Sequence, residues 1–206
     1  MTPVVYLHGF ASSPSSKKAR YFREHLQGIT VPDLAEGDFE HLTITGQLAV
    51  IERAAGGKPV SLIGSSLGGY LAALYAARHP EVERVLLLAP AFAFAKGWAA
   101  RLGPARVAEW RRTGWIEVFH YGENRNCRLA YQLLEDAERY EDYPDVRQPT
   151  LIFHGAQDDV VPAELAERFA AGRANVQLEI LESGHELLNV LGRIGDRTCE
   201  FLQRAS

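Results

Sequence analysis

The chain has 206 residues, of which 47% are hydrophobic and 23% are charged. This is enough material for one sizeable core and is short for two domains. A formal net charge of −4 at pH 7 argues against a general affinity for nucleic acid or for anionic membranes. The chain opens on an apolar run and no such run reaches transmembrane length, so we expect a cytoplasmic protein.

Strand and helix patterns alternate along the chain. Apolar, β-favouring runs predict six strands, at residues 3–8, 29–34, 59–64, 84–89, 150–154 and 176–181. Helical patterns are predicted between most of them, at residues 17–27, 41–55, 67–79, 162–172 and 186–203. This alternation favours an α/β fold with a mostly parallel sheet and helices on both faces.

Residues 91–149 form the longest region without a predicted strand. We expect this segment, which follows the strand at 84–89, to form a cap over the strand ends. It holds all three tryptophans of the chain. Phe92, Phe94 and Trp98 are the candidate residues for an aromatic wall that binds an acyl or alcohol group. Alternatively, such rings pack the insert onto the body of the protein.

The segment also carries an excess of basic residues. Between Lys96 and Arg128 there are seven basic and three acidic residues. Such an excess favours an anionic substrate, although charge runs of this kind are more often solvated helix faces.

The pentapeptide Gly64–Gly68 has the pattern G-x-S-x-G and stands between a predicted strand and a predicted helix. This is the pattern of the nucleophile elbow in serine hydrolases. The glycines are needed because side chains there would collide with the neighbouring strand and helix. Ser66 is therefore the candidate nucleophile. The alternative is a Gly/Ser-rich turn that serves packing or holds a phosphate.

A serine hydroxyl needs a base to take its proton, and an imidazole needs a carboxylate to orient it. His185 follows the predicted strand at 176–181 and is the candidate base. Asp158 and Asp159 both follow the strand at 150–154, and their positions alone leave either as the acid. The resemblance described below favours Asp158, and Asp159 would then cap or solvate the turn, as carboxylates often do at helix N-termini.

The developing oxyanion needs two hydrogen-bond donors. One is expected from the backbone N–H of Leu67, the residue after the nucleophile. The second is expected from the Phe10 N–H, in the loop after the first strand, where Gly9 allows a sharp bend. His8 is interpreted as a structural residue that holds this loop.

Together these segments resemble the α/β-hydrolase superfamily. The resemblance rests on the motifs Tyr6–Phe10, Ile63–Tyr70, His154–Pro162 and Gly184-His185. More narrowly, Leu7–Phe10 followed by Ser12–Lys17 resembles the small bacterial YqiA-like esterases. The resemblance implies an α/β-hydrolase fold, here a minimal sheet without the two leading antiparallel strands. It also implies hydrolysis of short-chain carboxylic esters or thioesters, with the acid at Asp158 and the base at His185.

The expected activity is therefore that of a carboxylic ester hydrolase, a serine esterase with a Ser66-Asp158-His185 triad. It would act on a small-molecule ester and would need no cofactor or metal. Two alternatives stay open. One is a thioesterase or C–C bond hydrolase with the same triad, and the other is a non-catalytic binding protein on the same scaffold. The sequence does not indicate the oligomeric state.

Overall fold

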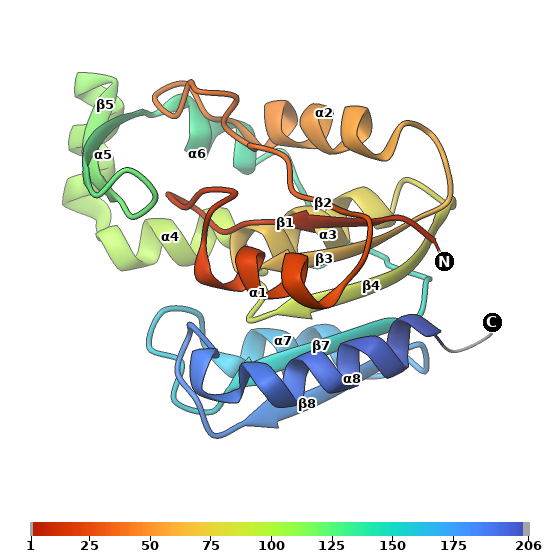
Figure 1. Cartoon of the computed structure of the whole chain (residues 1–206). Helices are drawn as coiled ribbons and strands as arrows, with labels where there is room; N and C mark the ends of the chain where they lie inside the picture. The colour runs from red at the N-terminus through yellow and green to blue at the C-terminus, as the bar shows by residue number, and fades with distance from the viewer. Residues whose placement is uncertain (1, 204–206) are drawn as a thin grey trace.

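Parallel strands form the central sheet of this protein, whose computed structural model describes residues 2–203 (Figure 1). Within that range the sheet has six strands in the order β2-β1-β3-β4-β7-β8, and each neighbouring pair is parallel. The strands are β1 (Val4–Leu7), β2 (Ile29–Thr30), β3 (Val60–Ser65), β4 (Val82–Leu88), β7 (Thr150–Gly155) and β8 (Val176–Leu181). The predicted mostly parallel sheet of about six strands is confirmed.

Helices cover both faces of the sheet because successive side chains of a strand point to opposite sides. In β1, Val5 and Leu7 join the larger core cluster, which includes residues of the helices on one face of the sheet and of the segment between β4 and β7. Val4 and Tyr6 point the other way and pack with two further helices. The first face carries α2 (Ile44–Ala55), α3 (Leu67–Ala76) and α7 (Ala163–Ala170), and the second carries α1 (Lys17–His25) and α8 (Leu191–Gln203).

One strand is much shorter than predicted. The sequence favours a strand over residues 29–34, but β2 ends at Thr30. Pro32 lies two residues after Thr30 and has no N–H to donate to a strand ladder. This accounts for the early end of β2 at the edge of the sheet.

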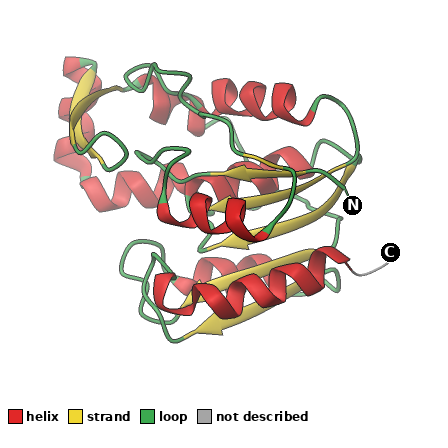
Figure 2. Cartoon of the chain, viewed as in Figure 1, coloured by secondary structure: helices red, strands yellow, loops and turns green. Residues whose placement is uncertain are grey.

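The segment between β4 and β7 contains more structure than the sequence analysis predicts. It folds into α4 (Phe94–Leu102), α5 (Pro104–Thr113), β5 (Trp115–His120), β6 (Arg125–Ala130) and α6 (Gln132–Ala137). Strands β5 and β6 form an antiparallel hairpin that was not predicted. Figure 2 shows this hairpin and its helices beyond one end of the central sheet.

The indole of Trp110 connects the helix α5 of this insert to its hairpin. It is fully buried on α5, and its Nε1–H donates a 3.0 Å hydrogen bond to the Leu129 carbonyl of β6. This tryptophan therefore packs the insert internally.

Candidate active site

Ser66 lies in a strained turn between β3 and α3. Its φ of 55° and ψ of −118° belong to a region that non-glycine residues rarely adopt. A Cβ at Gly64 would lie 2.3 Å from the Gly68 carbonyl oxygen, and one at Gly68 would lie 2.2 Å from that of Leu7. Both positions therefore require glycine so that the turn can approach its own helix and the neighbouring strand β1.

The structure brings Ser66, His185 and Asp158 together from three different loops. His185 Nδ1 is 2.8 Å from Asp158 Oδ2, and its Nε2 is 3.1 Å from Ser66 Oγ. A carboxylate can only accept, so Nδ1 carries the imidazole proton. Nε2 is then left to accept the hydrogen bond from the Ser66 hydroxyl, which is the arrangement a general base requires.

Asp158, not Asp159, is the carboxylate that faces His185. Its side chain is 0% exposed, whereas Asp159 lies on the surface. Its Oδ1 accepts hydrogen bonds from the backbone N–H groups of Val160 (2.9 Å) and Val161 (2.8 Å). Burial alone would raise the pKa of Asp158. The hydrogen bonds from His154, His185 and Val161 outweigh this effect and hold that pKa well below its usual range.

A second histidine also holds the Asp158 carboxylate. His154 is fully buried at the end of β7, and its Nε2 lies 3.1 Å from Asp158 Oδ2 and 2.8 Å from the Val161 carbonyl oxygen. Both neighbours are acceptors, so Nε2 carries the proton. The sequence analysis assigns no function to His154. The sequence signal for this contact was the spacing of four residues between His154 and Asp158. With this spacing, the turn after β7 can fold back so that the Asp158 carboxylate reaches the His154 ring.

The backbone groups expected for the oxyanion lie beside Ser66. Leu67 is the first residue of α3, so its N–H has no partner inside that helix. The loop after β1 reaches the same place, because a Cβ on Gly9 would lie 3.4 Å from Ser66 Cβ. Phe10 directly follows Gly9, which puts its backbone N–H in the loop that borders Ser66.

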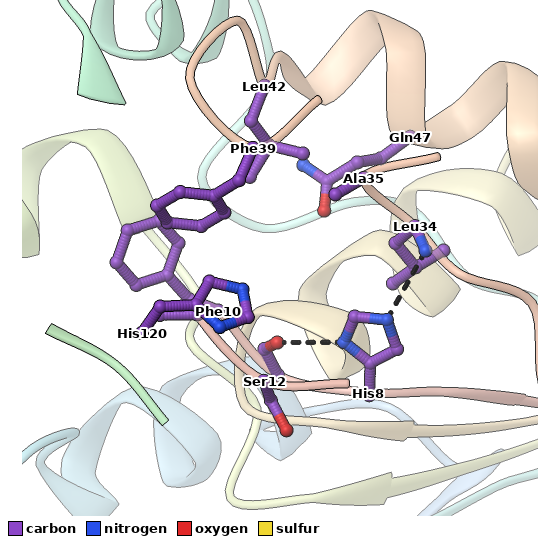
Figure 3. A pocket seen from close by; sticks show the side chains of 11 residues that line it. His8, Phe10, Ser12, Leu34, Ala35, Phe39, Leu42, Gln47 and His120 are labelled. Atoms are coloured by element: carbon purple, nitrogen blue, oxygen red, sulfur yellow. Dashed lines mark hydrogen bonds between the residues drawn. The ribbon is translucent and has the colours of Figure 1, made fainter. Parts of the chain in front are cut away.

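His8 holds the loop after β1 in place through hydrogen bonds of its ring. Its Nε2 accepts a 3.2 Å hydrogen bond from the Leu34 N–H, and its Nδ1 is 3.0 Å from the Gly9 carbonyl oxygen (Figure 3). Burial lowers the pKa of His8, and this effect outweighs the opposing influence of the Gly9 hydrogen bond. His8 is thus a neutral residue with both ring nitrogens in use.

Comparison with known proteins places the chain in a family. Residues 3–200 match the uncharacterised protein family UPF0227. The chain belongs to UPF0227. Its fold is that of the α/β-hydrolase superfamily, as the resemblance in the sequence implies.

Relatives and solved structures agree with this placement. This UPF0227 protein is 24% identical over 90% of its length to human monoacylglycerol lipase ABHD6, and the match covers 70% of that protein. It is 23% identical over 86% of its length to the mitochondrial palmitoyl-protein thioesterase ABHD10 of Bos taurus, of which 64% is covered.

Among solved structures, mouse α/β hydrolase domain-containing protein 10 superposes with a TM-score of 0.81 at 18% identity. That match covers 99% of this chain and 90% of the mouse chain. Est1E from Butyrivibrio proteoclasticus superposes with a TM-score of 0.69 at 20% identity, covering 98% of this chain and 89% of its own. These likenesses establish the fold, and the names of the relatives support a hydrolase.

The candidate aromatic residues of the UPF0227 chain separate into two groups. Phe94 and Trp98 lie around Phe10, with ring centroids 6.3 Å and 5.0 Å from it. Phe92 is 1% exposed and stacks on Phe169 of α7 at 4.2 Å. Phe92 therefore packs the core in this structure and offers no surface to a substrate, while the other two rings border the loop beside Ser66.

A small pocket adjoins the same loop (Figure 3). It measures about 210 Å³, part of it open to solvent. Phe10, Phe39 and Leu42 supply apolar walls, while Gln47 and His120 supply polar groups. The insert thus contributes His120 to a cavity built mainly by residues 8–47.

Neither a metal centre nor a membrane span is found in residues 2–203. No group of three or more His, Cys, Asp or Glu side chains within that range is arranged to hold a metal ion. In the same range, no helix combines the length and the apolar character needed to cross a bilayer.

Proposed function

We propose that this UPF0227 protein is a serine hydrolase that cleaves short-chain carboxylic esters through an acyl-enzyme intermediate. The observation that carries the proposal is the continuous contact from Ser66 Oγ through the His185 ring to the buried carboxylate of Asp158. Three side chains separated by up to 119 positions meet in the order and orientation that acyl transfer requires.

In the proposed mechanism, His185 takes the proton of Ser66 as its oxygen attacks the ester carbonyl. The Leu67 and Phe10 N–H groups stabilise the oxyanion, and Asp158 stabilises the imidazolium. His185 then gives its proton to the departing alcohol, which leaves an acyl group on Ser66. Water, activated by the same histidine, releases the acid and restores the hydroxyl.

A small acyl group is proposed because aromatic rings crowd the space around the oxyanion loop. Phe10 packs against Phe39 (5.5 Å between centroids) as well as against Trp98. In this proposal the insert at residues 91–149 acts as a cap, and its Phe94 and Trp98 limit the length of the chain that fits.

The test is hydrolysis of p-nitrophenyl esters from acetate to palmitate by the parent protein and by Ser66→Ala. We expect turnover to be fastest on short chains and to fall by several orders of magnitude in the variant. Labelling by a fluorophosphonate probe should likewise require Ser66. Undiminished turnover by folded Ser66→Ala would refute the proposal.

A thioesterase is the second candidate, favoured by the likeness to a palmitoyl-protein thioesterase. Acyl transfer from sulfur uses the same nucleophile, base and oxyanion donors. A matched pair of substrates, an acyl ester and the acyl thioester with the same chain, separates the two. A preference for the thioester of well over tenfold in kcat/KM would favour the second candidate.

A further inference from the structure

His185 lies on a segment without regular secondary structure. It stands between the end of β8 at Leu181 and the short helix η1 (Leu188–Val190). One side of the segment is held where Gln157 N–H donates to the Ser183 carbonyl, 2.9 Å away. The Asn189 side chain also fastens it, donating a 2.9 Å hydrogen bond to the Glu182 carbonyl. A 3.3 Å hydrogen bond from the Leu187 N–H to the Gly184 carbonyl closes a turn around His185 and Glu186.

Lys18 supplies a further contact to this segment from the far end of the sequence. Its Nζ donates a 3.1 Å hydrogen bond to the backbone carbonyl oxygen of Glu186, 168 positions away. Lys18 lies in the first turn of α1, behind its N-cap Ser16.

Two carboxylates of this region, those of Glu186 and Asp158, act on the Lys18 ammonium. Burial lowers the pKa of Lys18 to about 8, and the two carboxylates oppose this shift. The partly buried ammonium is thus placed where it interacts with the Asp158 carboxylate that orients His185.

We propose that Lys18 is a positioning residue for His185, which it serves by fixing the backbone of Glu186. The inference rests on the proposed function, since it assigns His185 as the base. A hydrogen bond to the adjacent residue restrains the imidazole between Ser66 and Asp158.

The test compares Lys18→Met, which keeps the aliphatic stem, with Lys18→Arg, which keeps a charged donor. Lys17→Met is the matched control, since Lys17 is the exposed neighbour on the same helix. With the best p-nitrophenyl ester, we expect Lys18→Met to lower kcat about tenfold while KM stays nearly constant. Lys18→Arg should recover most of the lost kcat, and Lys17→Met should resemble the parent protein.

The NMR signals of the His185 imidazole at a fixed pH provide a readout that does not depend on turnover. In Lys18→Met these signals should shift or broaden, because the segment that carries His185 loses a restraint, and in Lys18→Arg they should stay near those of the parent. Unchanged signals together with an unchanged kcat would overturn the inference, as would equal impairment of the Met and Arg variants. If the parent labels with no fluorophosphonate and cleaves no ester, the proposed function fails instead, while the NMR comparison still judges the role of Lys18.

Discussion

Replacing Asp158 with asparagine changes one atom of the carboxylate and tests the triad directly. Its Oδ1 accepts two backbone hydrogen bonds, and its Oδ2 faces N–H groups of His185 at 2.8 Å and His154 at 3.1 Å. An asparagine whose oxygen keeps the hydrogen bonds from Val160 and Val161 must present its NH₂ group to the imidazole N–H groups of His185 and His154. If the amide is flipped, its oxygen accepts from the imidazoles, but its NH₂ group then faces the two backbone N–H groups. Either orientation loses two hydrogen bonds in a fully buried place.

His185 can relieve the clash only by changing tautomer. Its Nδ1 would then accept from the amide, and its Nε2–H would point at Ser66 Oγ, 3.1 Å away. A protonated Nε2 cannot take the hydroxyl proton. We therefore expect Asp158→Asn to lower kcat by about 10⁴-fold, equivalent to ~5 kcal/mol in the activation barrier. Unpaired buried donors should also cost the fold about 1–3 kcal/mol each.

The assay is steady-state ester hydrolysis, with circular dichroism and thermal unfolding to establish that the variant is folded at the assay temperature. Asp159→Asn is the matched control, because this side chain is exposed and adjacent, and we expect it to stay within about twofold of the parent. The reasoning is refuted if folded Asp158→Asn keeps more than about a tenth of the parent kcat, which would leave under ~1.4 kcal/mol for the tautomer change. Equal losses in the two variants would refute it as well.

Three further outcomes are expected. Gly68→Ala should lower the free energy of unfolding by about 1–3 kcal/mol or more, because its Cβ would lie 2.2 Å from the Leu7 carbonyl oxygen. Gly97→Ala is the control in the same thermal unfolding experiment. It should stabilise helix α4 slightly, because no atom lies within 4 Å of the added Cβ. Trp98→Ala should shift the preferred p-nitrophenyl ester toward longer acyl chains, and an unchanged chain-length profile would argue against a wall at this ring. Stability measured by urea denaturation should fall above about pH 10, since burial raises the pKa of four tyrosines in the folded state and their contribution is lost as the pH rises past the unfolded value. The four are Tyr6, Tyr21, Tyr70 and Tyr75. Lys18, whose pKa is lowered to about 8 in the folded state, should instead raise the stability as the pH increases from about 8 to about 10.

Local patterns in the sequence were enough to predict the fold and the nucleophile turn. The central strands other than β2 were predicted to within about two residues, because parallel strands buried on both faces read as continuous apolar runs. The Gly64 and Gly68 positions were predictable because the collision that excludes a side chain arises within the strand-turn-helix unit and at its nearest neighbouring strand. The hairpin of the insert was missed because Trp115–His120 has no strict alternation of apolar and polar residues, and its alternation of buried and exposed side chains appears only in the structure.

The choice among neighbouring residues depended on the tertiary structure. Asp158 and Asp159 are chemically identical, and only the path of the loop after β7 decides which one is buried against His185. The sequence likewise placed Phe92 with Phe94 and Trp98, but the turn into α4 directs Phe92 into the core. The contact of Lys18 with Glu186 joins helix α1 to a loop 168 positions away. Periodicity in the sequence determines which face of a strand or helix a side chain occupies. The direction of a side chain in a loop instead follows from packing between distant segments, so no local sequence pattern predicts it.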